Sequence, residues 1–256
     1  MVNYQLSDGV EYRVRSHINI YDSPKCDRLA TQAAQGRHLL FFDPPQPPLV
    51  KGGRDGIDSL VQGDRTAVMV RLCEDDYPGW LDLRDIELLE VTETVYHPLV
   101  LSEAQIRDKL PIAITFTREA MHQSNYYLWG GTVGPNYDCS GLMQAAFVAA
   151  GIWLPRDAYQ QEAFTTSIIS VSDVEPGDLV FFGTPEKATH VGLYLGDNCY
   201  IHSSGKVQGR DGIGLDVLSD DGDAVSRAYY QQLRGYGKVV ASYQSRNWEL
   251  GIGHRA

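Results

Sequence analysis

The stretch that decides the fold is residues 138–151, DCSGLMQAAFVAAG. Asp138 is a favoured N-cap residue, Ser140–Ala150 is apolar on nearly every face, and Gly151 suits the position after a helix end. The pattern therefore predicts a buried helix that begins beside Cys139. Backbone N–H groups and the helix dipole at such an N-terminus favour a thiolate, so we expect Cys139 to have a lowered pKa and to act as a nucleophile. The alternative is an unreactive buried cysteine.

Two histidines downstream are candidates for the base that a thiol nucleophile requires. His190 and His202 lie on two strand-like stretches that flank the turn residues Gly196–Asn198. If all three turn residues form the loop, the histidines are diagonal neighbours about 7–8 Å apart on one face of a hairpin. A loop of two residues would break this arrangement. Each histidine alone could also be a hydrogen-bonded structural residue.

A cysteine and two histidines could also hold zinc, but zinc ligands are usually spaced closely on one element, which is not so here. We therefore expect no metal and no cofactor. Upstream, Tyr127 could donate a hydrogen bond to an oxyanion. Alternatively, Tyr127 and its neighbour Trp129 belong to the core or to a pocket wall.

Composition narrows the class of protein. The 256 residues include 22 Lys and Arg against 33 Asp and Glu, a net charge of −11, so neither nucleic acid nor an anionic membrane is an expected partner. No N-terminal signal pattern and no run of about 18 apolar residues is present. The cysteines are widely spaced, as free thiols in a reducing compartment would be. We expect a cytoplasmic location. The cysteines with no helix cap, expected to be unreactive, are Cys26, Cys73 and Cys199.

The chain divides into two predicted domains, residues 1–92 and 93–256. The first has short strand-like stretches, which predict a small β-barrel. A Pro- and Gly-rich stretch, residues 43–64, interrupts it as a surface loop or as an extended segment for a partner. The predicted strands are Tyr12–Ile20, Arg28–Ala33, Arg37–Phe42, Thr66–Leu72 and Trp80–Leu83.

The second domain places helices before strands. Helices are predicted to open at Ser102 and at Pro111, the latter ending near His122, and a third covers Ser140–Ala150. Because the connections between its strands are too short for helical crossovers, we expect an α+β domain with an antiparallel sheet. The predicted strands are Asp178–Phe182, Val191–Leu195, Tyr200–Ser203 and Val225–Leu233.

Six short motifs follow one another in a fixed order: Tyr127–Gly131, Asp138–Gly141, Leu154–Arg156, Pro176–Phe182, His190–Gly196 and Ile201–Ser203. Together they resemble the NlpC-type cell-wall peptidases, a papain-like cysteine peptidase family, over roughly residues 103–235. The resemblance implies that Cys139 is the nucleophile, His190 the general base, His202 the residue that orients it and Tyr127 the oxyanion residue. After the third motif, relatives often have Ser or Thr where this chain has Asp157-Ala158.

Residues Gly79–Leu81 resemble the Gly-Trp strand of bacterial SH3-like domains. The two domains together resemble γ-D-glutamyl-L-diamino acid endopeptidases, which implies a murein peptide substrate with a free N-terminal L-Ala and a role in peptide recycling. The resemblance also implies that Tyr77, Asp138 and Ser140 help to recognise the substrate and that Trp129 forms a pocket wall. The alternatives are a wall-remodelling hydrolase, a thioester acyltransferase and a muropeptide-binding module without turnover. The sequence specifies no oligomeric state.

Overall fold

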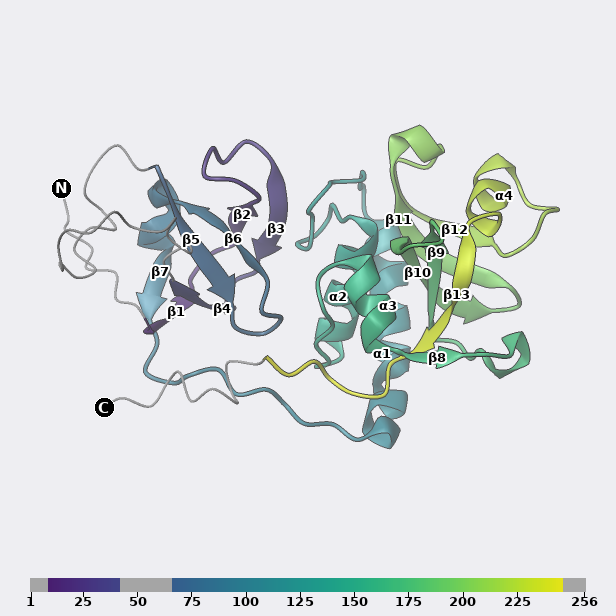
Figure 1. Cartoon of the computed structure of the whole chain (residues 1–256), viewed down its shortest axis with the longest axis horizontal. Coiled ribbons are helices and arrows are strands. Elements are labelled where there is room, and N and C mark those ends of the chain that lie inside the picture. The colour runs from purple at the N-terminus through teal and green to yellow at the C-terminus, as the bar shows by residue number, and fades with distance from the viewer. Residues whose placement is uncertain (1–8, 42–65, 246–256) are drawn as a thin grey trace. The chain divides into compact units, whose positions relative to one another are not determined.

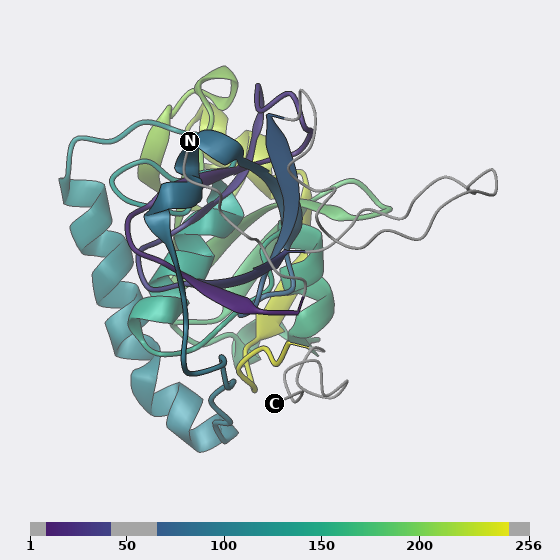
Figure 2. The same cartoon turned by 90° about the vertical axis from the view of Figure 1, so that its left-hand side faces the viewer.

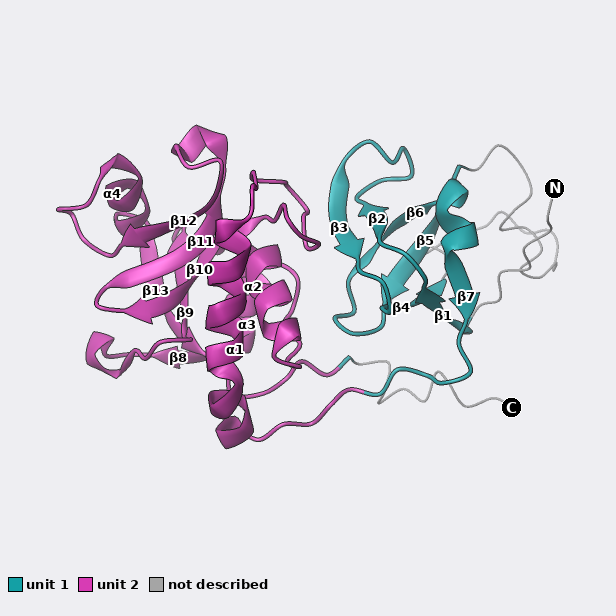
Figure 3. Cartoon of the chain, turned by 180° about the vertical axis from the view of Figure 1, so that it is seen from behind, with its two compact units in different colours: residues 1–97, 245–256 teal, residues 98–244 magenta. Residues whose placement is uncertain are grey.

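The structure is a computed structural model that describes residues 9–41 and 66–245. Its contacts divide the chain into two compact units, drawn in Figure 3. Unit 1 is residues 1–97 with 245–256, and unit 2 is residues 98–244. The predicted Pro-rich loop, residues 43–64, lies outside the described residues. Within the described ranges no helix is long and apolar enough to cross a membrane.

Unit 1 contains a seven-stranded antiparallel sheet in the order β3-β2-β6-β5-β4-β1-β7. Among its described residues, β3 and β7 stand at the two ends of this order, so the predicted closed barrel is not seen. The strand predicted over Tyr12–Ile20 is two strands, because the exposed residues 15–17 turn the chain between separate partners. The strands are β1 (Glu11–Val14), β2 (Ile18–Tyr21), β3 (Leu29–Ala33), β4 (His38–Phe41), β5 (Ala67–Leu72), β6 (Pro78–Asp82) and β7 (Leu89–Val91), with a 3₁₀ helix at Leu83–Leu88.

Unit 2 is an α+β unit with helices on both faces of an antiparallel sheet (Figure 1). The strand order is β12-β11-β10-β9-β13-β8. Its helices are α1 (Glu103–His122), α2 (Cys139–Ala149), α3 (Ala158–Phe164) and α4 (Ala224–Tyr230). Its strands are β8 (Thr166–Ile168), β9 (Leu179–Gly183), β10 (Ala188–Gly196), β11 (Cys199–Ser204), β12 (Gly212–Val217) and β13 (Leu233–Lys238).

The sheet of unit 2 is buried on both faces, which explains why β9 is an unbroken apolar run. Leu179 and Phe181 pack in the core that contains α1 and α2, whereas Val180 and Phe182 pack in the core that contains α4. Successive side chains of a strand point to opposite faces, so both sets must be apolar. One face of the sheet therefore packs against α2, which begins at Cys139, and the other face packs against α4.

The two helices predicted around Pro111 are one helix, α1, which Figure 2 shows running without a break. Ser102 caps it, accepting a hydrogen bond from the Gln105 amide while the Gln105 side chain accepts one from the Ser102 amide. Its buried residues include Ile106 and Ala113, on either side of the proline. Because packing continues across Pro111, the helix persists although the proline contributes no N–H.

The strand predicted over Val225–Leu233 is wrong, because this segment is mostly α4. Asp223 caps α4 by accepting from the Ser226 amide at 2.9 Å. Val225 and Tyr229 then lie one turn apart and are buried against the sheet. The β-branched and aromatic residues that favoured a strand are thus the buried face of a helix. Further elements that the sequence did not predict are β7 in unit 1 and α3, β8, β12 and β13 in unit 2.

The β10–β11 hairpin has a shorter turn than predicted. Asp197 and Asn198 both have positive φ, 51° and 59°, as in a two-residue type I′ turn, and Gly196 pairs with Cys199. The predicted three-residue loop is therefore wrong. A bulge at Leu195 adds the residue that the turn lacks.

The bulge restores the register that the three-residue loop was expected to give. Leu193 pairs with Ile201, which brings Gly192 beside His202 on the neighbouring strand. His190 and His202 consequently share one face of the hairpin, as the sequence analysis expected from a three-residue loop. Gly192 is required here because a Cβ atom would lie 2.7 Å from Cδ2 of the buried Tyr200.

We predict that Gly192→Ala lowers the free energy of unfolding of unit 2 by about 1–3 kcal/mol, because the added methyl group overpacks the β10–β11 interface. The measurement is urea unfolding followed by circular dichroism. Ser167→Ala, on an exposed position of β8, is the control and should change the free energy by less than about 0.5 kcal/mol. Equal midpoints for Gly192→Ala and the wild type would contradict the prediction.

Candidate active site

Cys139 is the first residue of α2, where the sequence predicted it. Asp138 caps the helix, accepting from the Gly141 amide at 2.6 Å. Cys139 is 6% exposed, and its sulfur accepts hydrogen bonds from the backbone N–H groups of Ser140 and Val191. The second of these places the sulfur against β10, next to His190.

The predicted lowering of the Cys139 pKa is wrong. Burial of the thiol and the charge of Asp138 raise its pKa to about 12. The hydrogen bonds from Ser140 and Val191 act in the opposite direction but do not offset this desolvation. Cys139 is therefore a neutral thiol at rest and needs a base to remove its proton.

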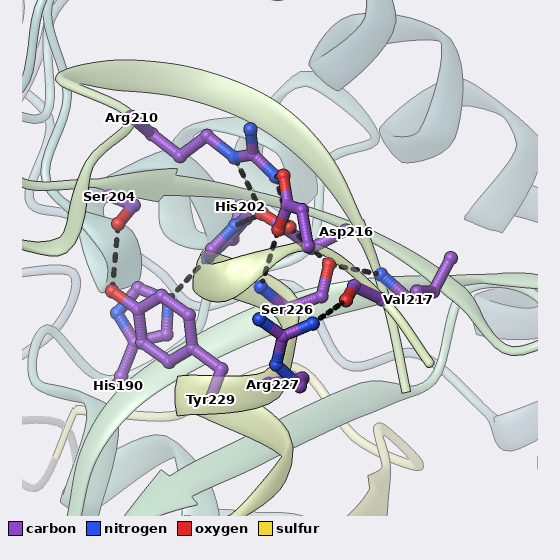
Figure 4. A network of polar contacts seen from close by, with 11 residues as sticks. His190, His202, Ser204, Arg210, Asp216, Val217, Ser226, Arg227 and Tyr229 are labelled. Atoms are coloured by element: carbon purple, nitrogen blue, oxygen red, sulfur yellow. Dashed lines mark hydrogen bonds and ion pairs between the residues drawn. The ribbon is translucent and has the colours of Figure 1, made fainter. Parts of the chain in front are cut away.

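The two histidines form a hydrogen-bonded chain that ends on a carboxylate (Figure 4). Nε2 of His190 lies 2.6 Å from Nδ1 of His202, and Nε2 of His202 lies 2.7 Å from Oδ2 of Asp216. All three residues are buried. Burial holds the pKa of His190 well below its usual range and also lowers the pKa of His202. A neutral His190, the residue before Val191 on β10, is available to accept the thiol proton.

Asp216 is a site residue that the sequence analysis missed. It lies on β12, whose segment GIGLDV contains two glycines and gave no strand signal. Its oxygens also accept from Arg210 and from the Ser226 hydroxyl, the latter at 2.6 Å. The sequence signal that could have indicated the strand is the alternation of Ile213, Leu215 and Val217 with Gly214 and Asp216.

Tyr229 is the second missed residue, hidden because its helix was predicted as a strand. Its ring stacks on that of His190, with centroids 4.3 Å apart and planes 27° apart. Its hydroxyl lies 2.8 Å from Oγ of Ser204 (Figure 4). Stacking on one side and the hydrogen bond to His202 on the edge restrict the orientation of the His190 ring.

Tyr127 is half-buried near the nucleophile. Burial, followed by the nearby groups Cys139 and Asp138, raises the pKa of its hydroxyl above the usual range. The hydroxyl therefore keeps its proton and is able to donate a hydrogen bond. This fits the predicted oxyanion role, which stays a prediction.

The predicted substrate residues Asp138 and Ser140 are engaged with a buried arginine. Arg156, 1% exposed, donates to both oxygens of Asp138 at 3.1 and 2.6 Å and to Oγ of Ser140 at 3.0 Å. The amides of Gly130 and Gly141 also donate to Asp138, at 2.8 and 2.6 Å. These four donors fill the acceptor sites of the Asp138 carboxylate. Asp138 therefore holds the loops around Cys139 in place.

The two remaining predicted substrate residues are Trp129 and Tyr77. Trp129 is 58% exposed on the loop before α2, as a pocket wall would be. Tyr77 belongs to unit 1, and its substrate role stays a prediction. Within residues 9–41 and 66–245, no group of three or more His, Cys, Asp and Glu side chains is placed to hold a metal ion.

Residues 124–234 match the NlpC/P60 family model. This segment is therefore similar to the NlpC/P60 family. It contains Cys139, His190, His202, Asp216 and Tyr229, so the whole hydrogen-bonded chain lies inside the matched segment.

Two curated relatives are similar to part of this chain. The probable endopeptidase p60 of Listeria seeligeri is 36% identical over 118 residues, 46% of this chain and 20% of the relative. The bifunctional muramidase/DL-endopeptidase CwlT of Bacillus subtilis is 41% identical over 95 residues, 35% of this chain and 29% of CwlT. The chain thus matches less than a third of the length of these relatives.

Among solved structures, an NlpC/P60 family protein from Bacillus cereus aligns with 91% of this chain and 64% of its own, with a TM-score of 0.42 and 18% identity. The peptidoglycan hydrolase RipB from Mycobacterium tuberculosis aligns with 56% of this chain and 70% of its own, with a TM-score of 0.43 and 22% identity.

We predict that Arg156→Met destabilises unit 2 by about 3–5 kcal/mol, because it leaves the Asp138 carboxylate buried without its partner. The measurement is the free energy of unfolding from urea titration. Arg107→Met is the matched control, since Arg107 makes only half-exposed ion pairs on the same unit and should contribute about 0–1 kcal/mol. Similar losses for the two variants would contradict a special role of the buried pair.

The raised thiol pKa predicts how alkylation of Cys139 depends on pH. A pKa near 12 means that the thiolate fraction keeps rising up to that value, so the rate with iodoacetamide should increase steadily through about pH 9. Mass spectrometry of the labelled peptide gives the rate for this cysteine alone. A plateau between about pH 5 and 7 would instead indicate a thiolate already paired with an imidazolium, and the assignment of a neutral resting thiol would fail.

Proposed function

We propose that the protein is a cysteine endopeptidase that hydrolyses the γ-D-glutamyl–diamino acid bond of murein peptides with a free N-terminal L-Ala. The observation that carries the proposal is the placement of Cys139 at the start of a buried helix, against β10, the strand that bears His190. His190 is the first member of the hydrogen-bonded series His190–His202–Asp216. The same segment matches the NlpC/P60 family model, and part of the chain is similar to relatives named endopeptidases, including one named a DL-endopeptidase.

The proposed reaction begins with proton transfer from Cys139 to His190 as the sulfur attacks the γ-carbonyl of D-Glu. The Tyr127 hydroxyl donates to the oxygen that becomes negative. His190 then returns the proton to the leaving amine of the diamino acid, and a thioester remains on Cys139. Water, deprotonated by the same histidine, hydrolyses the thioester and restores the thiol.

We propose that the protein selects its substrate by contacts with the N-terminal end of the peptide. Trp129 would form a wall of the pocket, and Ser140 and Asp138 would lie near the L-Ala ammonium. Because Asp138 is saturated by Arg156 and two amides, its charge would act on the ammonium through space and through Ser140 rather than as an unpaired carboxylate. Tyr77 would contribute from unit 1, which we propose is an SH3-like domain.

A requirement for a free amine would restrict the enzyme to peptides already released from glycan. We therefore propose a role in recycling murein peptides, in the cytoplasm. Wall remodelling is the second candidate, favoured by the similarity to CwlT, which is named a bifunctional muramidase/DL-endopeptidase. The third candidate is an acyltransferase, in which the thioester passes its acyl group to an amine or alcohol instead of water. The fourth is a module that binds the peptide without turnover.

The test is mass spectrometry of the peptide L-Ala-γ-D-Glu-diaminopimelate after incubation with the protein. We predict release of diaminopimelate and L-Ala-D-Glu by the wild type and no turnover by Cys139→Ala, whose side chain cannot form the thioester. Cys199→Ala is the matched control and should retain wild-type activity, because Cys199 lies at the far end of β11 from His202.

Further arms distinguish the alternatives. N-acetylation of L-Ala should lower kcat/KM by at least about tenfold if the ammonium is recognised. Equal cleavage of intact murein would favour wall remodelling, and aminolysis products with an added amine would favour acyl transfer. Binding of the peptide with no product from the wild type would overturn the proposed hydrolysis.

A further inference from the structure

We propose that Asp216 is a positioning residue that fixes the proton on Nε2 of both histidines and so reserves Nδ1 of His190 as the base. The inference rests on the proposed function of His190 and concerns a residue outside the Cys139, His190 and His202 set. Its basis is the arrangement of donors around one buried carboxylate.

The register of two strands brings Asp216 to His202. On the β11–β12 ladder His202 pairs with Gly214 and Tyr200 pairs with Asp216. Residues two apart on a strand share a face, so Asp216 lies diagonally beside His202. The side chains of Asp216 and His202 are fully buried, and their hydrogen bond is 2.7 Å long.

The other side chains that hydrogen-bond to the Asp216 carboxylate, Arg210 and Ser226, are donors. Arg210 donates to both oxygens, with its Nε 3.0 Å from Oδ2, and the Ser226 hydroxyl donates to Oδ1 at 2.6 Å. Together with His202 these contacts fill the four acceptor sites of an ionised carboxylate. Burial alone would raise the pKa of Asp216, but the hydrogen bonds from His202, Arg210 and Ser226 hold it well below the usual range.

An ionised Asp216 determines which atom donates in each hydrogen bond of the series His190–His202–Asp216. The carboxylate only accepts, so Nε2 of His202 must carry a proton. In a neutral His202 the other nitrogen, Nδ1, is then an acceptor, and the proton in the 2.6 Å bond to His190 belongs to Nε2 of His190. Neutral His190 is left with a lone pair on Nδ1.

Arg210 makes Asp216 a weaker proton acceptor. It is paired with Asp216 and, at 2.8 Å, with Asp223, the N-cap of α4. A carboxylate that already neutralises a guanidinium is a weak proton acceptor, so the proton stays on His202 when His190 becomes charged. Asp216 therefore orients and stabilises the imidazolium without taking a proton itself.

The first experiment needs no substrate and no variant. The ¹⁵N spectrum of histidine-labelled wild type, below its unfolding temperature and near neutral pH, reports which ring nitrogen carries hydrogen. We expect protonated Nε2 and unprotonated Nδ1 for both His190 and His202. A proton on Nδ1 of His202 would overturn the proposal.

The second experiment uses Asp216→Asn, whose amide group can donate to His202 and so invert its tautomer. We expect the Nε2 proton of His202 to be lost from the dominant form, and kcat for the murein peptide to fall by about 10²-fold or more with KM within about threefold. Alkylation of Cys139 by iodoacetamide should slow in parallel. Asp178→Asn is the control, because Asp178 is equally buried and its carboxylate accepts from the Glu175 amide.

The outcomes separate this inference from the proposed function. Wild-type tautomers and wild-type alkylation in Asp216→Asn would overturn the role of Asp216 whether or not the peptide is cleaved. Altered tautomers and slow alkylation in Asp216→Asn, with a wild type that does not cleave the peptide, would uphold the positioning role and reject the substrate. If Asp216→Asn fails to fold, the wild-type tautomers still decide the question.

Discussion

The buried pair between Asp138 and Arg156 is the interaction on which the site depends. One carboxylate caps α2, binds the amide of Gly130 in the preceding loop and neutralises an arginine from the segment that follows the helix. Three stretches of chain are thus fixed to the first turn of α2, where Cys139 lies. The pair is satisfied by hydrogen bonds on every side, which is the condition under which a buried ion pair can be tolerated.

Burial then determines how the site can work. The helix N-terminus and two backbone N–H groups favour a thiolate at Cys139, but loss of water and the Asp138 charge favour the thiol more strongly. The same loss of water keeps His190 neutral. A neutral thiol beside a neutral imidazole separates charge only when the reaction begins, and the ionised Asp216 is placed to stabilise the imidazolium formed at that moment.

The register of the strands places the site residues on one face of the sheet. A bulge at Leu195 compensates for a two-residue turn, so that His190 and His202 share one face of the hairpin. The next strand continues the same face with Asp216, and α4 closes it with Tyr229. A single-residue change of register on β11 or β12 would point one of these side chains away from the others.

Local signals in the sequence determined the helix at residues 138–151, its cap, the position of Cys139 and the strands that carry the two histidines. Caps and alternation act over a few residues and can be recognised without the rest of the chain. Asp216 and Tyr229 could not be recognised in this way, because a glycine-rich strand and a helix rich in β-branched and aromatic residues contradict local propensity. Only tertiary packing decided those two elements and the thiol pKa, since both depend on which distant groups exclude water from the site.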